Sequence, residues 1–208
     1  MTATLLNEAD AAAHRERIWV ELAKVARPDS RFHWDFGSFI ADFEGSDRCA
    51  SAVRELAAYR RGELVFITPD NSTEALRAQL MEDGRPFLMT TYGIGRGFLY
   101  LDPAVSRNGV RFGKGHGYFD LERAMLSEIG IVGPTSEIVD VVHDCPVVEQ
   151  NLIGDDHDVP VDWIVTPTRT LTVADAGRTP GRIRWELLEN SPLRNIPLSN
   201  VRLKAAFT

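Results

Sequence analysis

Residues 64–72, Leu-Val-Phe-Ile-Thr-Pro-Asp-Asn-Ser, decide the fold class. The run of four apolar residues is typical of a strand covered on both faces, and the turn residues behind it end that strand. Asn71 or Ser72 is placed to cap a helix that ends at Gly84, and a second strand is predicted over 86–91. This strand–helix–strand order indicates an α/β fold.

The same alternation continues in both directions from this segment. The spacing of apolar residues predicts helices over 7–26, 45–61 and 120–129, and strands over 138–143 and 161–166. Strands that alternate with helices predict a layered α/β domain with a largely parallel sheet. No repeat divides the chain, so we expect one domain over 1–208, with residues 178–208 as an extended appendage.

Composition excludes several classes of function. The chain carries 23 Lys and Arg against 30 Asp and Glu, a net charge of −7, which argues against binding to nucleic acid. No apolar run reaches the roughly 20 residues that span a bilayer, so no membrane partner is expected. Cys49 and Cys145 lie far apart, without metal-ligand spacing, as in a reduced cytoplasmic protein. We therefore expect a cytoplasmic enzyme or small-molecule binder.

The most informative stretch is 108–120, Asn-Gly-Val-Arg-Phe-Gly-Lys-Gly-His-Gly-Tyr-Phe-Asp, which leads directly into a predicted helix. Gly113, Gly115 and Gly117 alternate, which lets the backbone approach an anion and turn its N–H groups toward it. The helix that follows adds a partial positive charge at its N-terminus. This pattern predicts a site for phosphate or a nucleotide.

Charged residues flank and interrupt these glycines. Arg111 and Lys114 supply full positive charges for phosphate oxygens, and Asp120 at the start of the helix is suited to Mg²⁺. The alternative is a glycine-rich turn whose cations are only solvated. The spacing matches neither the GxxxxGK[ST] loop nor the dinucleotide-binding fingerprint.

Two acidic clusters lie further along the chain. Asp162 interrupts an apolar run, so its charge needs either a metal ion or backbone N–H groups as partners, and both interpretations remain open. His143 and Asp144 follow the end of a predicted strand, where open parallel sheets bind their ligands. His143 alone is more often structural, and Cys145 is more often a buried apolar residue than a nucleophile.

The glycine-rich stretch, 111–120, resembles the RxGxGxGYxD signature of the 5-formyltetrahydrofolate cyclo-ligase family. Further segments resemble its cyclo-ligase-like paralogue branch, in the same order along the chain: 15–19, 69–71 with Arg77, 141–144, 157–162, 164–168, 184–188 and 196–197. The resemblance implies a three-layer α/β/α fold of the ribose-phosphate-isomerase and CoA-transferase type.

It also implies a reaction, in which ATP with Mg²⁺ phosphorylates the formyl oxygen of 5-formyltetrahydrofolate and the ring closes to 5,10-methenyltetrahydrofolate. Carried over by motif, the residues that bind the nucleotide are Arg15, Arg111, Gly113, Lys114, Gly115, His116, Gly117 and Tyr118. Asp120 and Asp162 are the expected metal ligands. The expected catalytic residues are Arg111, Lys114, Tyr118, His143 and Asp144.

Three departures from the family pattern keep other functions open. Ala11 stands where the family has a phosphate-binding Lys, the segment 92–108 is short, and Cys145 follows Asp144 where a Gln is common. One alternative is an ATP-independent isomerase, lyase or hydrolase of the same fold, acting on a small phosphorylated or carboxylated metabolite. Another is a non-catalytic binder of nucleotide or folate. Fold alone does not separate these functions.

Overall fold

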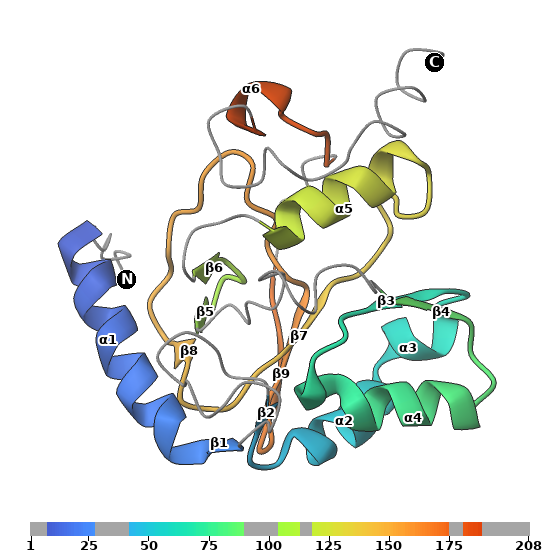
Figure 1. Ribbon diagram of the computed structural model, residues 1–208, viewed down its shortest axis with the longest axis horizontal. Coiled ribbons are helices and arrows are strands. Elements are labelled where there is room, and N and C mark those ends of the chain that lie inside the picture. Colours follow the sequence, from blue (N-terminus) through green and yellow to red (C-terminus); the bar gives the residue numbers. More distant parts are fainter. Residues whose placement is uncertain (1–7, 28–41, 90–103, 113–117, 175–180, 189–208) are drawn as a thin grey trace.

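Figure 1 shows the computed structural model of the chain, which describes residues 8–27, 42–89, 104–112, 118–174 and 181–188. No helix in these ranges is long and apolar enough to cross a membrane. The helices are α1 (Glu8–Val25), α2 (Ser46–Glu55), α3 (Ala57–Arg61), α4 (Glu74–Glu82), α5 (Tyr118–Glu128) and α6 (Trp185–Leu188), with a 3₁₀ turn η1 (Asn71–Thr73).

The strands are short and pair both ways. Their bounds are β1 (Ala26–Arg27), β2 (Asp42–Phe43), β3 (Val65–Ile67), β4 (Phe87–Met89), β5 (Ala104–Ser106), β6 (Arg111–Phe112), β7 (Val139–Val141), β8 (Val147–Val148), β9 (Trp163–Val165) and β10 (Thr170–Thr172). The pairs β3–β4, β5–β8 and β7–β9 are parallel. The pairs β1–β2, β5–β6 and β9–β10 are antiparallel. The α/β fold class predicted from the sequence is confirmed.

Helices cover the strands on two sides. Figure 1 shows α1 beside β5 and β8, whereas α2 and α4 lie on the other side, beyond β7 and β9. Ile18 and Leu22 of α1 pack against Ala104 of β5 and Val148 of β8. On the opposite side, α2, α3 and α4 form a second cluster that includes Val165 of β9. The strands therefore lie between two helical layers.

Neighbouring residues in the central strands face different layers. In β5, Ala104 packs toward α1 while Val105 packs inward against Ile164 of β9. In β9, Ile164 faces this inner cluster and Val165 faces α2 and α4. All four side chains are completely buried, because successive side chains of a strand point to opposite faces and both faces are covered here.

The predicted helix over 45–61 is broken. It forms α2 and α3 with Leu56 between them, in an extended conformation and buried in the core. The break turns the chain so that Tyr59 of α3 is also buried, and its hydroxyl donates a hydrogen bond to Asp83 Oδ2 at 2.8 Å. Burying both residues explains a turn that helical spacing alone does not indicate.

The cap predicted for α4 is also different. The turn η1 precedes α4, its N-cap residue is Thr73, and no side-chain cap bond forms there. Thr73 Oγ1 instead donates to the carbonyl oxygen of Thr68, and Arg77 Nη1 donates to the carbonyls of Thr68 and Asp70. The backbone after β3 is therefore held by Thr73, the N-cap residue of α4, and by Arg77 within α4.

Residues 181–188, which we call the C-terminal segment, pack on α5. Ile183 is buried against Leu121 and Ala124, and Trp185 packs beside them. The backbone N–H of Ile183 also donates to Glu128 Oε1 at 2.9 Å. This part of the predicted appendage is thus attached to α5 and includes the short helix α6 rather than being extended throughout.

Candidate functional site

An ion pair joins the two flanks of the glycine-rich stretch. Arg111 Nη2 of β6 donates to Asp120 Oδ1 of α5 at 3.0 Å, and these side chains are only 8% and 15% exposed. The Arg111 guanidinium also lies over the ring of Phe119, 3.9 Å from its centroid. The ion pair therefore holds the end of β6 against the start of α5. We call these two joined ends the base of the glycine-rich stretch.

Asp120 connects this base to a second segment of the chain. Its Oδ1 also accepts the backbone N–H of Val159 at 3.0 Å. Next to Val159, Asp158 Oδ2 accepts the backbone N–H of Asp155 at 2.8 Å. Burial raises the pKa of the Asp158 carboxyl, and the negative charge of Asp120 raises it further, against the lowering effect of that N–H. Asp120 and Asp158 are therefore close enough to interact.

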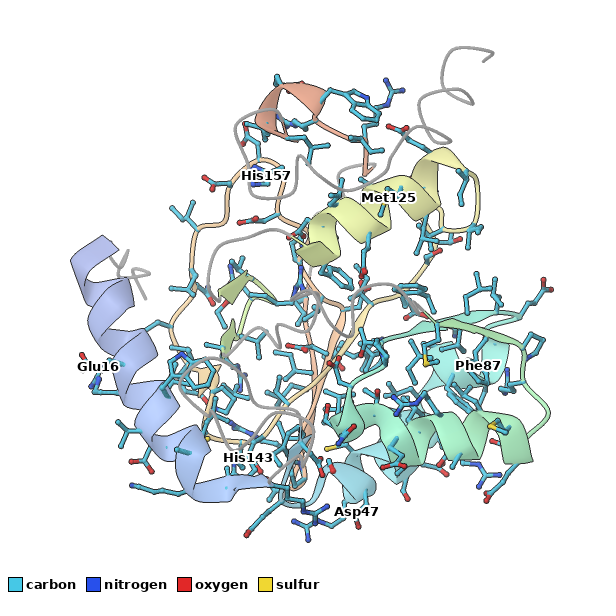
Figure 2. All side chains as sticks on the ribbon, in the orientation of Figure 1. Glu16, Asp47, Phe87, Met125, His143 and His157 are labelled. Carbon is cyan, nitrogen blue, oxygen red and sulfur yellow. The ribbon has the colours of Figure 1, made fainter. Side chains whose placement is uncertain are left out.

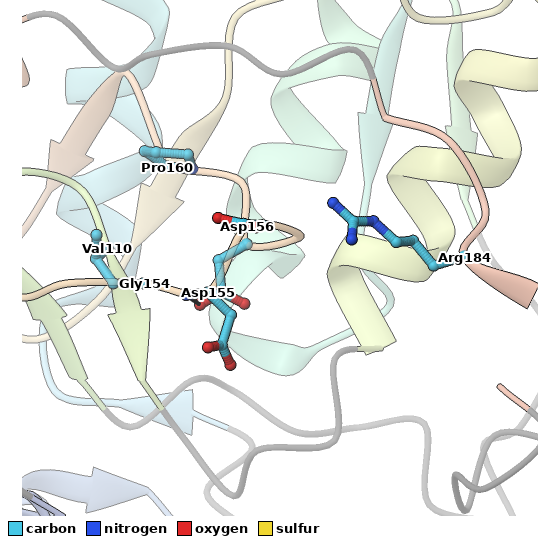
Figure 3. Close-up of a pocket in the computed structure, with 7 residues that line it drawn as sticks. Val110, Gly154, Asp155, Asp156, Pro160 and Arg184 are labelled. Atoms are coloured by element: carbon cyan, nitrogen blue, oxygen red, sulfur yellow. Dashed lines mark hydrogen bonds between the residues drawn. The ribbon is translucent and has the colours of Figure 1, made fainter. Parts of the chain in front are cut away.

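A pocket with a volume of about 460 Å³ opens beside Asp158. Figure 3 shows that its walls come from three parts of the chain: the turn before β6, the loop before β9, and the C-terminal segment. We call it the acidic pocket; the residues that line it are Val110, Gly154, Asp155, Asp156, Asp158, Pro160 and Arg184. Val110 precedes Arg111 in the chain, so the pocket adjoins the base described above.

Asp162, the other expected metal ligand, makes a backbone contact. Its Oδ2 accepts the N–H of Ile138 at 2.7 Å, and its own N–H donates to the carbonyl of Ile138 at 2.9 Å. These bonds align the segments that lead into β7 and β9. This is the backbone-bonded arrangement that the sequence left open, and metal binding by Asp162 stays a prediction.

His143 and Asp144 lie away from the acidic pocket. Figure 2 shows His143 at the end of the molecule where α2 begins, and His157 at the opposite end, near α6. Asp144 Oδ1 accepts hydrogen bonds from the hydroxyls of Thr166 and Thr168, both at 2.6 Å. The Asp144 carboxylate is thus bound to the turn between β9 and β10. The structure does not bring Asp144 close to Asp158.

The neighbouring Cys145 pairs with His143. Its Sγ lies 3.3 Å from His143 Nδ1, and the imidazole ring meets the Phe43 ring edge-on, with 5.9 Å between centroids. Burial raises the pKa of the Cys145 thiol to about 11. The thiol is therefore protonated at neutral pH, which does not favour a nucleophile.

Glu122 is a titratable residue that the sequence did not single out. It lies on α5 between the buried residues Leu121 and Arg123. Burial raises the pKa of its carboxyl from 4.5 to about 7, and the negative charge of the buried Asp70 adds to the effect. No local pattern in the sequence singles out Glu122, because the shift arises from burial in the folded chain and from Asp70, which is distant in the sequence.

Several predicted site residues have no described side chain. Gly113, Lys114, Gly115, His116 and Gly117 lie outside the described residues. Arg15 falls within α1 and Tyr118 begins α5, so only their backbone positions are known. The predicted roles of these residues stay predictions.

The residues around the acidic pocket fit a magnesium–phosphate group. Across the described ranges, no three or more His, Cys, Asp or Glu side chains are grouped to hold a metal ion by themselves. Mg²⁺ is usually bound through one or two carboxylates, with phosphate oxygens and waters completing its shell. Asp158 lines the pocket, Asp120 lies close enough to Asp158 to raise the pKa of its carboxyl, and Arg184 lines the same pocket with a cation suited to phosphate.

Comparison with known proteins supports the resemblance seen in the sequence. Residues 99–167 match the sequence model of the 5-formyltetrahydrofolate cyclo-ligase family. A methenyltetrahydrofolate synthase domain-containing protein of Bos taurus is 27% identical over 227 residues, which cover 88% of this chain and 59% of that protein. Its Mus musculus counterpart is 45% identical over 101 residues, 48% of this chain and 27% of that protein. The resemblance to the family is thus confirmed, and the chain spans about three-fifths of the bovine relative.

A solved structure shares the fold. The NMR structure of Aquifex aeolicus 5,10-methenyltetrahydrofolate synthetase superposes with a TM-score of 0.52 at 15% sequence identity. The superposition covers 84% of this chain and 97% of that one. The layered α/β fold expected from the resemblance is therefore confirmed.

Proposed function

We propose that this chain is an ATP- and magnesium-dependent cyclo-ligase-like enzyme that acts on 5-formyltetrahydrofolate or a related carbonyl metabolite. The observation that carries the proposal is the Arg111–Asp120 ion pair, which fixes the base of the glycine-rich stretch beside the acidic pocket. The family match over 99–167 includes both residues of this pair and the loop that carries Asp158.

The chemistry needs an activated oxygen, because a formamide oxygen is a poor leaving group until it is phosphorylated. The formyl oxygen takes the terminal phosphoryl group of ATP. N10 then bonds to the formyl carbon and gives up its proton, and the oxygen departs within the phosphate. The products are 5,10-methenyltetrahydrofolate, ADP and phosphate. Catalysis of this kind depends on positioning and on neutralising phosphate charge.

The residues of the chain have separate roles in this proposal. The N–H groups of the glycine-rich stretch and the side chain of Lys114 bind phosphate oxygens. Arg111 adds a positive charge and, through Asp120, keeps the stretch at the start of α5. Asp120 and Asp158 hold Mg²⁺, which supplies charge neutralisation on the transferred group. The resemblance implies that Tyr118 contacts both the nucleotide and the folate.

The test is a spectroscopic assay with purified protein. Incubation with ATP, Mg²⁺ and 5-formyltetrahydrofolate should raise the methenyltetrahydrofolate absorbance, and omission of either ATP or Mg²⁺ should abolish the rise. Asp158→Asn should lower the rate at least tenfold, because it removes a metal-binding charge. The matched control is Asp47→Asn, an exposed Asp at the start of α2, which should keep the wild-type rate. Folded protein that gives a flat trace with all components would remove this folate as the substrate.

A further inference from the structure

The acidic pocket has walls of opposite charge. The loop before β9 contributes the carboxylates of Asp155, Asp156 and Asp158, and the C-terminal segment contributes Arg184. Figure 3 shows the Arg184 guanidinium pointing from the C-terminal segment toward the loop that carries Asp155 and Asp156. Among the described residues, Arg184 forms no ion pair with these carboxylates, although it shares the pocket with them. The space between the walls is therefore open to a ligand.

The backbone next to Arg184 is firmly held. Ile183 is 6% exposed and packs against Leu121 and Ala124 of α5. Its N–H donates to Glu128 Oε1 at 2.9 Å. Because α5 also carries Asp120 at its start, one helix positions both the cation of the pocket and the base of the glycine-rich stretch. Arg184 thus projects from a segment that is fixed against α5, while its own side chain stays exposed.

We propose that Arg184 binds the phosphate of a metal-bound phosphate ligand in the acidic pocket. The inference rests on the proposed function and assigns a residue to its phosphate site. Three carboxylates repel a free phosphate, so the anion binds here only with a divalent cation between it and the aspartates. The phosphate oxygens that face away from the metal then accept paired hydrogen bonds from the guanidinium.

This arrangement assigns different tasks to the two walls. Asp158 and its neighbours determine whether the metal is bound, and Arg184 determines how tightly the phosphate is held once the metal is present. Losing a charge-assisted, paired contact weakens binding by roughly tenfold or more. The loss should appear with any ligand that carries the metal-bound phosphate group, because the guanidinium does not contact a base or a sugar in this proposal.

Calorimetric titration of the full chain with ATP and with inorganic triphosphate, each with and without Mg²⁺, tests the proposal. Arg184→Gln should raise the Kd for both magnesium complexes by roughly tenfold or more, and Arg184→Lys, which keeps the charge, should raise it less. The matched control is Arg182→Gln. Arg182 is exposed, belongs to the same segment and does not line the pocket, so its loss should leave the Kd within about twofold.

The outcomes separate this inference from the proposed function. Suppose that the wild type binds Mg·ATP and that Arg184→Gln and Arg182→Gln bind it with equal Kd values. This result overturns the role of Arg184 and leaves the proposed enzyme function standing. Binding of Mg·triphosphate but not of Mg·ATP, with the Arg184 effect present, supports the inference and removes ATP as the ligand. Equal binding without Mg²⁺ overturns the metal-bound ligand, and failure to bind either compound overturns both proposals. Equal melting temperatures of the variants show that any change arises in binding.

Discussion

Arg111 and Asp120 are nine residues apart in the chain, and their side chains meet at 3.0 Å across the glycine-rich stretch. The pair is mostly buried, and Asp120 accepts the N–H of Val159 as well. A single carboxylate therefore connects β6, α5 and the loop that precedes β9. This contact holds together the two ends of the stretch that we propose binds phosphate.

Asp120→Asn should destabilise the protein by about 3 kcal/mol, because it removes the negative charge that the mostly buried Arg111 guanidinium contacts. Asn keeps an oxygen that can accept the Val159 N–H, so the loss reports mainly on the charge. Thermal denaturation measures the change. Asp47→Asn, at a side chain that is 65% exposed, should cost less than about 0.5 kcal/mol. Equal melting temperatures for the two variants would show that the pair does not stabilise the fold.

Gly109→Ala should be far more costly than Gly84→Ala. Both glycines have positive φ, 79° and 63°. A Cβ at Gly109 would lie 2.6 Å from the carbonyl oxygen of Val161, whereas one at Gly84 would meet nothing within 4 Å. We expect about 1 kcal/mol for Gly84→Ala from backbone strain alone, and 3 kcal/mol or more for Gly109→Ala. Chemical denaturation compares the two, and similar losses would contradict the close approach of Gly109 to Val161.

Glu122→Gln should change how stability depends on pH. The folded state holds the Glu122 proton up to a pKa of about 7, whereas the unfolded chain releases it near 4.5. The folded state therefore binds more protons between these values, so this group favours unfolding as the pH rises from 4.5 to 7. Gln stays neutral and removes this penalty. The variant should match the wild type near pH 4 and exceed its stability by up to about 3 kcal/mol above pH 7.

Melting temperatures measured across this pH range check the Glu122 expectation. Glu186→Gln, at an exposed position of α6, provides the control and should change the melting temperature little. If the melting temperatures of Glu122→Gln and the wild type differ by the same amount at every pH, the expectation that burial raises the Glu122 pKa is wrong.

Asp144 should prove to stabilise the turn between β9 and β10. Its Oδ1 accepts the hydroxyls of Thr166 and Thr168, so Asp144→Ala should cost about 2 kcal/mol by removing two hydrogen bonds to a charged acceptor. Thr166→Val should be less destabilising in the Asp144→Ala background than in the wild type, because both remove the same bond. A lowered catalytic rate with an unchanged melting temperature would instead support the predicted catalytic role of Asp144.

Much of the fold follows from local patterns. The apolar runs that become β3, β7 and β9, and the helical spacing that becomes α1, α4 and α5, predicted those elements to within a few residues. The break at Leu56 and the antiparallel partners of β5 and β9 were not predicted. They depend on contacts between segments that are distant in the sequence, such as the hydrogen bond from Tyr59 to Asp83. A local sequence pattern does not identify such partners.

The site was predicted less completely, for a similar reason. The sequence assigned Arg111 to phosphate and Asp120 to a metal, and the structure adds that the two bind each other. Asp158 and Arg184 lie in segments that resemble the family, but neither was predicted as a site residue. Their shared pocket forms from segments that are distant along the chain. Glu122 was missed because its unusual pKa arises from burial and from Asp70, not from its neighbours in the sequence.

The most direct test of the central claim is to locate the divalent cation. Crystals grown with Mn²⁺ in place of Mg²⁺ and with ATP should give an anomalous scattering peak within coordination distance of an Asp158 carboxylate oxygen, with nucleotide phosphate between the metal and Arg184. A well-ordered nucleotide with its metal peak elsewhere, and with the acidic pocket filled only by water, would contradict the account.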